Sequence, residues 1–448
     1  MTTWLLERME AWRDAPALVW ADVHASYGDL LDAVAQWQVE LDRQALGAGS
    51  VVVIEATFSP KACALLLALL ERRAIAVPVT PGQRVHLEEF QGIAHAQATV
   101  HIADDDTFTV ARHAPTGTHA LTEKLRALGH AGLVIFSSGS SGAAKAVLHD
   151  FEALLEKFRT PRQKKCVLTF LLFDHIGGID TLMNTLANGG TVVTTPSRDP
   201  EVVCALIAKH RVHTLPTSPT FLNLLLLSEA WQRHDLSSLQ VIAYGTEPMP
   251  QPTLTRLAEV FPNAKLVQTY GLSELGVLRS RSRPDGSLWL SFSNEGFETQ
   301  VRDGLLWVRS PAAMLGYLNA PDLFDGEGWL NTQDAVEVDG PWLRVLGRVS
   351  DLINVGGQKV YPAEIEAVVM SMPNVADVAV YGEKSPLTGQ FVAARVNLVE
   401  PEPLDVFKRR LRAFCRERLA PYKIPVRIEL TEDRQFSARF KKLRSPTS

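Results

Sequence analysis

One short stretch of the chain collects the residue types that could hold a polyanion. It consists of Ser137, Ser138, Gly139, Ser140, Ser141 and Gly142, followed by two alanines and Lys145. Glycines let backbone amides approach a ligand closely, hydroxyls add hydrogen-bond donors, and the lysine adds positive charge. The Gly-x4-Gly-Lys-Ser/Thr spacing of a Walker A loop is absent. The stretch therefore predicts a phosphate-binding loop, with a Ser/Gly-rich surface turn as the alternative.

A second group of residues joins an aromatic ring, a hydroxyl and a carboxylate in one loop. Tyr270, Gly271, Ser273 and Glu274 follow the strand-like residues 265–267. An aromatic face can stack on a purine, and a carboxylate can hold Mg²⁺ on phosphates. In the alternative, Ser273 caps a helix and Glu274 interacts with the positive end of its dipole. The residues by themselves leave both interpretations open.

An acidic residue and an arginine mark two further motifs. Asp334 ends the motif 328–334, and Arg348 opens the motif 347–366, which also contains Gly356 and Gly357. A free carboxylate is a common partner of ribose hydroxyls, arginine is a common partner of phosphate, and paired glycines allow a tight turn. Alternatively, Asp334 ends a hairpin and Arg348 makes a surface ion pair.

The elements that must position these residues change in character along the chain. β-Branched runs alternate with helix-length amphipathic segments up to about residue 261, which predicts α/β units around partly parallel sheets. Short runs over 286–349 predict a smaller antiparallel β region. Strand and helix patterns then restart, with helices expected at 362–370 and 404–419. The fold class is therefore α/β: a large N-terminal domain over 1–347 and a small, mobile α+β C-terminal domain over 348–448.

Composition restricts the class of protein. A chain of 448 residues holds roughly two to three domains. The net charge of −5 argues against a nucleic-acid partner. The four cysteines have no metal-ligand spacing, and the N-terminus is a poor signal peptide, so we expect a cytoplasmic enzyme. The longest apolar run, 62–70, is too short for a membrane span.

Taken in order, these motifs resemble the adenylate-forming superfamily of acyl- and aryl-CoA synthetases, peptide-synthetase adenylation domains and firefly luciferase. The resemblance extends from Ala25 to the C-terminus and is most specific over 328–366. It implies an acid–thiol ligase that uses ATP and Mg²⁺ to turn a carboxylic acid into an acyl-adenylate. The acyl group would then pass to the thiol of CoA or of phosphopantetheine on an acyl carrier protein supplied as a separate chain.

The resemblance also implies roles for single residues. The loop 137–142 with Lys145 would hold the β- and γ-phosphates, Ser273 would contact the α-phosphate, and Glu274 would hold Mg²⁺. Asp334 would bind the ribose, and Arg348 would touch phosphate or ribose. The residues expected against adenine are Tyr270, Gly271, Gly245, Thr246 and Glu247. The C-terminal domain would swing about Ser350, so that Gly356 and Gly357 line a channel for the thiol.

The acid pocket is expected to begin at Asp174 and His175, with Tyr244 behind it. His175, Gly177 and Gly178 fit the aromatic-His-x-Gly-Gly pattern of the CoA ligases, which favours an aryl or fatty acid. Peptide-synthetase domains instead carry Phe-Asp here, and that aspartate pairs with an ammonium group, so amino-acid activation is the alternative. In purely structural interpretations, Asp174 caps a helix and His175 is a core histidine.

The C-terminus departs from the family pattern, as does Gln333 where glycine is usual. The family's Gly-Lys step, whose lysine serves adenylation, aligns with Ala438 and Arg439. Arginine keeps the charge but is planar and bulkier than lysine. Three alternatives follow: Arg439 acts less well, Lys441 or Lys442 replaces it, or the protein is a catalytically weakened nucleotide- or acyl-binding homologue.

Overall fold

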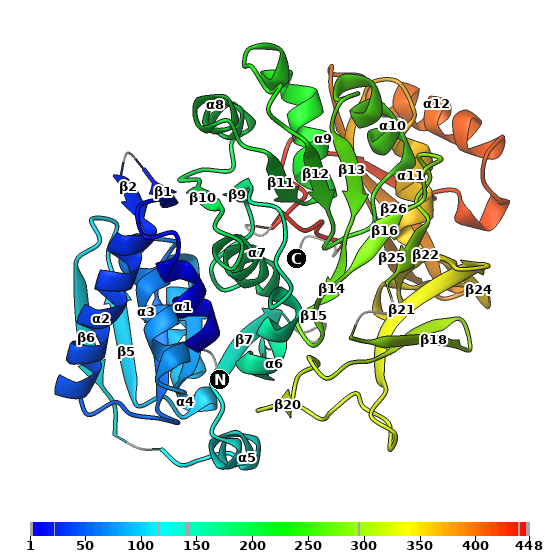
Figure 1. The fold of residues 1–448 in the computed structure, drawn as a ribbon. Coiled ribbons are helices and arrows are strands. Elements are labelled where there is room, and N and C mark those ends of the chain that lie inside the picture. Colours follow the sequence, from blue (N-terminus) through cyan, green and yellow to red (C-terminus); the bar gives the residue numbers. More distant parts are fainter. Residues whose placement is uncertain are drawn as a thin grey trace.

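The structure is a computed structural model that describes residues 3–21, 23–114, 116–138, 144–293, 296–437 and 440–444. Two sheets flanked by helices form the N-terminal α/β part, a β region follows, and an α+β unit ends the chain (Figure 1). The predicted fold class is confirmed. The α-helices are α1 (Thr3–Glu10), α2 (Tyr27–Arg43), α3 (Pro60–Glu71), α4 (Leu87–Ala94), α5 (Ala120–Leu128), α6 (Phe151–Leu155), α7 (Ile176–Leu186), α8 (Pro200–His210), α9 (Pro219–Ser228), α10 (Gln251–Val260), α11 (Pro362–Met370) and α12 (Leu404–Arg416). Short 3-10 helices span Pro81–His86, Glu156–Phe158, Ala230–Gln232, Val349–Asp351 and Pro421–Lys423.

The first sheet has a parallel centre that is buried on both faces. Val52 and Ile54 pack in one cluster with α3, whereas Val51 and Val53 pack in another with α4. Strands buried on both faces are therefore continuous β-branched runs, as the sequence predicted. In spatial order the strands are β20 (Gly316–Tyr317), β8 (Ala144–Asp150), β7 (Gly132–Ser138), β4 (Ile75–Val79), β3 (Val51–Glu55), β5 (Ala98–Ile102) and β6 (Phe108–Arg112).

The second sheet is parallel except for its edge strand β2. Its outer face is covered by α8, α9 and α10, and α7 packs in the same cluster as α3, between the two sheets (Figure 1). In spatial order the strands are β13 (Lys265–Gln268), β12 (Val241–Tyr244), β11 (Thr214–Thr217), β9 (Cys166–Thr169), β10 (Thr191–Thr194), β1 (Pro16–Trp20) and β2 (Val23–Ser26). The parallel order brings the loops after β9 to β13 to one edge.

An antiparallel sheet follows, which confirms the β region expected over 286–349. A hairpin of β14 (Tyr270–Leu272) and β15 (Gly276–Leu278) precedes it. The strands of the sheet, in spatial order, are β16 (Ser280–Ser282), β17 (Leu290–Phe292), β22 (Trp342–Arg348), β21 (Leu330–Asp339), β19 (Leu305–Arg309) and β18 (Glu298–Arg302).

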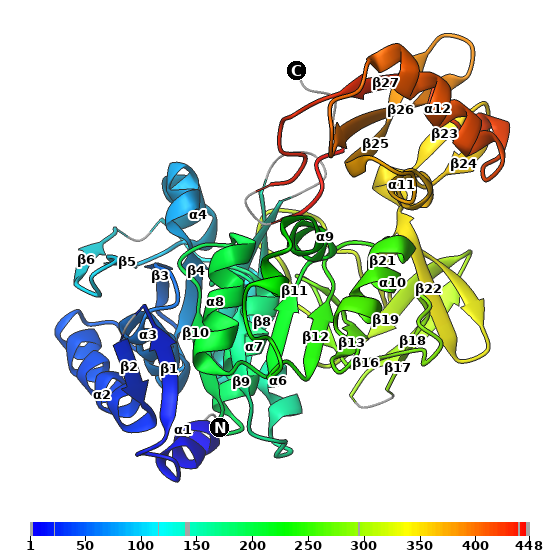
Figure 2. The same ribbon diagram turned by 90° about the horizontal axis from the view of Figure 1, so that it is seen from above.

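The last unit has its own core, in which α11 and α12 pack against a sheet. The predicted helix over 362–370 is confirmed, whereas the helix expected to reach residue 419 ends at Arg416. Asn223 of α9 donates a hydrogen bond to the Ala376 carbonyl oxygen at 2.9 Å, and Figure 2 shows the unit beside α9. The strands are β24 (Gln358–Val360), β23 (Ile353–Val355), β26 (Gly389–Leu398) and β25 (Val375–Ser385), with β27 (Arg427–Leu430) paired to β26.

Two predictions from composition can be compared with the structure. All four cysteines are free thiols, and Cys63, Cys204 and Cys415 are buried. Within the described ranges, no helix combines the length and the apolar character needed to cross a bilayer.

Candidate active site

The carboxyl edge of the second sheet gathers many of the candidate residues. The loops after β9 and β12 carry His175 and Glu247, and Tyr270 follows β13. These strands are parallel members of one sheet, with β11 between β9 and β12, so their carboxyl ends lie at the same edge. Open α/β sheets bind ligands at this edge. We refer to the β12–β13 side as the nucleotide end and to the β9–β10 side as the acid end, following the predicted roles.

Asp334 is the centre of a buried polar network at the nucleotide end. The residue is 5% exposed, and its Oδ2 accepts a hydrogen bond from the Tyr270 hydroxyl at 2.6 Å. Arg348 Nε lies 3.3 Å from Asp334 Oδ1, because the two residues are opposite each other in β21 and β22. Burial raises the pKa of Asp334, and the Arg348 charge opposes that rise. Asp334 and Arg348 form the outermost pair of the β21–β22 hairpin, so the alternative in which Asp334 ends a hairpin and Arg348 makes an ion pair is compatible with the structure, and the ribose and phosphate roles stay predictions.

Glu274 and Lys145 meet at Tyr317, a residue that the sequence analysis missed. The Tyr317 hydroxyl donates to Glu274 Oε1 at 2.6 Å, and Lys145 Nζ lies 5.2 Å from the centre of the Tyr317 ring. Burial raises the pKa of Tyr317, so its hydroxyl keeps the proton that it donates. Nothing in the sequence indicates this contact, because Tyr317 belongs to a short strand far from both partners.

His149 is a second residue that the sequence analysis missed. It is fully buried, and its Nε2 lies 2.6 Å from the Ser273 carbonyl oxygen. Burial lowers the pKa of His149, so the ring is neutral and donates through Nε2. The contact ties β8, which carries Lys145, to the turn that carries Ser273 and Glu274. That turn joins β14 to β15, so the alternative in which Ser273 caps a helix is wrong.

Two glycines predicted to face adenine are also required by backbone packing. A Cβ on Gly271 would lie 2.7 Å from the Gly276 carbonyl oxygen of the same hairpin. A Cβ on Gly245 would lie 2.8 Å from the Thr269 carbonyl oxygen. The next residue, Thr246, has φ +73°, a left-handed conformation. Contact with adenine stays a prediction for all three residues.

Glu247 joins the loop after β12 to the end of the chain. Its Oε1 accepts hydrogen bonds from the Thr220 backbone nitrogen at 2.8 Å and from the Thr220 hydroxyl. Its Oε2 accepts one from the Lys442 backbone nitrogen at 3.1 Å. The carboxylate is therefore bonded on both oxygens, once within the N-terminal part and once to the C-terminal segment.

The C-terminal segment, residues 435–437 and 440–444, lies against the acid end. The Phe440 ring centre is 5.4 Å from that of Phe170 and 6.1 Å from that of Phe221. Lys442 Nζ donates to Asp377 Oδ1 and to the Val378 carbonyl oxygen, each at 2.8 Å. The Lys442 ammonium group therefore bonds to β25 in this arrangement, which argues against the alternative in which Lys442 replaces the usual lysine.

Several predicted residues fall outside the described part of the chain: Gly139, Ser140, Ser141, Gly142 and Arg439. Ser137 and Ser138 end β7, and Ser137 is opposite Lys145 in β8. The sequence stretch 139–143 therefore connects the two strands of an antiparallel pair.

At the acid end, His175 and not Asp174 caps a helix. His175 is the N-cap of α7, and its Nδ1 accepts a hydrogen bond from the Gly177 nitrogen at 3.0 Å. Asp174 is buried and accepts a hydrogen bond from the Thr80 hydroxyl at 3.0 Å. A Cβ on Gly178 would overlap the Leu172 carbonyl oxygen. Gly178 belongs to the glycine pair that favoured an aryl or fatty acid, and local backbone packing requires a glycine there as well.

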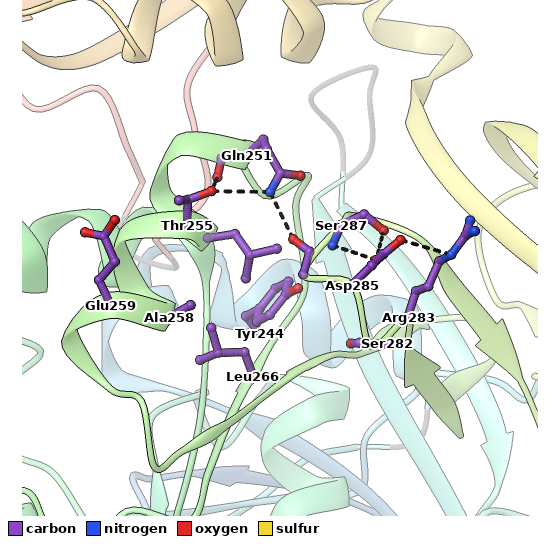
Figure 3. Close-up of a pocket in the computed structure, with 12 residues that line it drawn as sticks. Tyr244, Gln251, Thr255, Ala258, Glu259, Leu266, Ser282, Arg283, Asp285 and Ser287 are labelled. Atoms are coloured by element: carbon purple, nitrogen blue, oxygen red, sulfur yellow. Dashed lines mark hydrogen bonds and ion pairs between the residues drawn. The ribbon is translucent and has the colours of Figure 1, made fainter.

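Tyr244 lies on the other face of the sheet from α7. It packs with Leu254 in the core cluster beneath α10, whereas α7 belongs to the cluster between the two sheets. Tyr244 lines a pocket of about 450 Å³ whose walls include Leu266 and whose rim carries Gln251 and Arg283 (Figure 3). The structure does not bring Tyr244 together with His175.

The predicted thiol-channel glycines form an exposed hairpin turn. Gly356 and Gly357 form the two-residue turn between β23 and β24. Their φ angles are +59° and +88°, and glycine adopts such positive values without strain. The hairpin is at one edge of the C-terminal sheet, and β25, which contacts α9, is at the other. In this arrangement the glycines lie away from that contact.

Known proteins match the chain over most of its length. A family model described as AMP-binding enzyme matches residues 5–318, and one described as AMP-binding enzyme C-terminal domain matches residues 364–441. A probable CoA ligase, CCL5 of Humulus lupulus, is 30% identical over 65% of this chain and 58% of its own length. A long-chain-fatty-acid–CoA ligase of Escherichia coli O157:H7 is 30% identical over 66% of this chain and 58% of its own.

Solved structures share the fold. The crystal structure of the anthranilate CoA ligase AuaEII with anthranoyl-AMP superposes with a TM-score of 0.83 at 20% identity. The superposition covers 98% of this chain and 95% of that one. The matched curated relatives are longer, and the first of them are covered over only 56–63% of their length.

Proposed function

The chain belongs to the AMP-binding enzyme family, and on that premise we propose that it is an acid–thiol ligase. It activates a carboxylic acid with ATP and transfers the acyl group to CoA or to the phosphopantetheine of a separate acyl carrier protein. An aryl or fatty acid is the favoured substrate class, because His175, Gly177 and Gly178 fit the CoA-ligase pattern and one relative is named a long-chain-fatty-acid–CoA ligase. A cytoplasmic location would give the enzyme access to ATP and CoA.

The observation that carries the proposal is the joining of four distant motifs by direct side-chain contacts. Lys145 and Glu274 share Tyr317, and Tyr270 and Arg348 share Asp334. Side chains held by one another before a ligand arrives keep the geometry that a charged transition state needs. A set of unrelated surface residues would not be paired in this way.

In the first half-reaction, a carboxylate oxygen of the acid attacks the α-phosphorus of ATP. The bond from that phosphorus to the bridging oxygen breaks, and pyrophosphate leaves with the electron pair. In the second, a thiolate attacks the acyl carbon and AMP leaves. No protein nucleophile takes part, so Lys145, Ser273 and Arg348 act by orienting the phosphates and neutralising their charge.

Glu274 is suited to a magnesium ion. One of its oxygens accepts the Tyr317 hydrogen bond, and its Oε2 has no partner within the described ranges. Mg²⁺ prefers such carboxylate oxygens and keeps the rest of its shell for water and phosphates. Bound there, the ion would neutralise phosphate charge.

We further propose that residues 348–448 rotate about Ser350 between the half-reactions. Asp351, next to this position, forms an ion pair with Arg444 at 3.3 Å, so the end of the chain is tied to the hinge in the present arrangement. Both residues lie in the rotating part, so rotation would keep this pair. It would release the hydrogen bonds from Asn223 to Ala376 and from Lys442 to Glu247, and turn Gly356 and Gly357 toward the thiol.

The test is pyrophosphate release by the full chain with ATP, Mg²⁺ and a panel of aryl, fatty and amino acids. We expect release with at least one acid, loss of release when EDTA removes the metal, and thioester formation when CoA is added. Release with none of the acids would contradict the proposal and support the weakened homologue, which binds ATP without forming an adenylate.

A further inference from the structure

Arg198 lies at the acid end and has no part in the reaction as described so far. It follows β10 and precedes α8, so it leaves the sheet beside the loop that carries Asp174 and His175. Its Nε donates a hydrogen bond to the Phe170 carbonyl oxygen at 2.8 Å. Its Cζ lies 5.4 Å from the centre of the Phe170 ring. One nitrogen and one face of the guanidinium group are therefore held by the scaffold.

The two terminal nitrogens of Arg198 remain available. Neither has a hydrogen-bond or ion-pair partner in the part of the chain that the structure describes. Burial lowers the pKa of Arg198, and the nearby Asp174 charge only opposes that effect. The Asp174 carboxylate accepts a hydrogen bond from the Thr80 hydroxyl. A half-buried guanidinium with an open pair of N–H groups suits a planar carboxylate, which it binds through two parallel hydrogen bonds.

Further aromatic rings pack against the Phe170 ring that Arg198 covers. The Phe170 ring that Arg198 covers lies 4.4 Å from Phe221 and 5.4 Å from Phe440, centre to centre. Phe170 and Phe221 are buried and Phe440 is partly exposed, so the immediate surroundings of Arg198 are apolar and largely aromatic. The reacting carboxylate of the substrate must reach the phosphates at the nucleotide end, so it is not the group that meets Arg198.

Resting on the function proposed above, we propose that Arg198 binds a second carboxylate on the substrate, and that the enzyme prefers dicarboxylic acids with an apolar or aromatic body. Arg198 is thereby a specificity-determining residue of the acid end. Its positive charge beside Asp174 also disfavours an ammonium group there, which weakens the amino-acid alternative.

The experiment compares matched pairs of acids, benzoate with phthalate and hexanoate with adipate. Calorimetry measures their binding to the full chain, and pyrophosphate release measures their activation. The variants are Arg198→Leu, which removes the charge, and Arg198→Lys, which keeps the charge but lacks the planar guanidinium group with its two parallel N–H donors. Arg256→Leu is the matched control, because Arg256 is exposed on α10 and, among the described residues, pairs only with Glu259.

For the natural protein and the control, we expect the dissociation constant of at least one diacid to be at least about tenfold lower than that of its matched monoacid. Hydrogen bonds to a charged group are strong enough for this difference. Arg198→Leu should abolish that preference, and Arg198→Lys should keep part of it. Activation should show the same change in KM with little change in kcat.

Two results would overturn the inference: no diacid preference in the natural protein, or a preference that survives in Arg198→Leu. Failure of the proposed function has a different signature. Arg198-dependent diacid binding without any pyrophosphate release would refute ligase activity and leave the subsite intact. Pyrophosphate release from monoacids alone, without Arg198-dependent diacid binding, would support ligase activity and refute the subsite.

Discussion

The two ends of the site are built in different ways. At the nucleotide end, functional side chains bond to one another across distant strands, as Tyr270 and Arg348 do at Asp334. At the acid end, each side chain bonds to its own scaffold: His175 to its helix, Asp174 to Thr80 and Arg198 to a backbone oxygen. The first arrangement is rigid and suits one constant ligand. The second lets each wall residue change separately, which suits a family whose acids differ.

The largest effect should come from the carboxylate at the nucleotide end. Glu274→Gln keeps an acceptor for the Tyr317 hydroxyl but removes the charge for Mg²⁺. We expect kcat for pyrophosphate release to fall by about 10²–10³, with melting temperature unchanged, because the lost interaction acts on the reacting phosphates. The control is Glu259→Gln on the exposed face of α10. A loss below threefold would mean that Glu274 is not part of the site.

Asp334→Asn should weaken ATP binding and spare acid binding. The variant loses the charge that Arg348 and Tyr270 share, so the KM for ATP should rise about 10- to 100-fold. The KM for the acid should stay within about twofold if the two ends are as separate as their contacts suggest. Asp339→Asn, in the same strand but exposed and paired with Arg283, is the control. Equal changes in both constants would contradict the separation.

His149 should act as a positioning residue for the nucleotide end. His149→Ala removes the donor to the Ser273 carbonyl oxygen, so we expect about a tenfold loss of kcat/KM for ATP, with thermal stability lowered by the buried cavity. His149→Gln, whose amide can donate, should restore part of the activity. A merely structural role would lower stability in both variants without this rescue of the kinetic constant.

Asp174→Asn should affect stability more than the nucleotide reaction. The amide oxygen can still accept the Thr80 hydroxyl, so the loss should be about 1 kcal/mol in the free energy of unfolding, measured by urea denaturation. The KM for ATP should not change. If activity toward the best acid instead falls a hundredfold, the amino-acid alternative gains support.

The smallest effect concerns backbone strain beside Asp334. Gln333 has φ +62°, a conformation that glycine adopts without strain. Gln333→Gly should therefore raise stability by up to about 1 kcal/mol, with unchanged kinetics. Gln300→Gly, at an ordinary strand position of β18, should lower stability and serves as the control. A destabilised Gln333→Gly would show that the side chain compensates for the strain.

Local patterns predicted most of the scaffold. The helix over 362–370 was predicted with its bounds, because hydrophobic periodicity and a proline at its start are local properties. The motifs around Asp334 and Arg348 were recognised for the same reason. Helix ends were less certain: α12 stops three residues before the predicted end.

What the sequence by itself determined is the inventory of the site: which hydroxyls, carboxylates and cations the chain carries, in which order, and on which kind of element. Only the tertiary structure decided which of them meet. Tyr317, His149 and Arg198 were missed, and Tyr244 was assigned to the wrong side of its sheet, because each depends on a partner or a face set by packing between distant segments. Such contacts leave no periodicity or spacing in the chain, since they arise only when separate strands are brought to one edge.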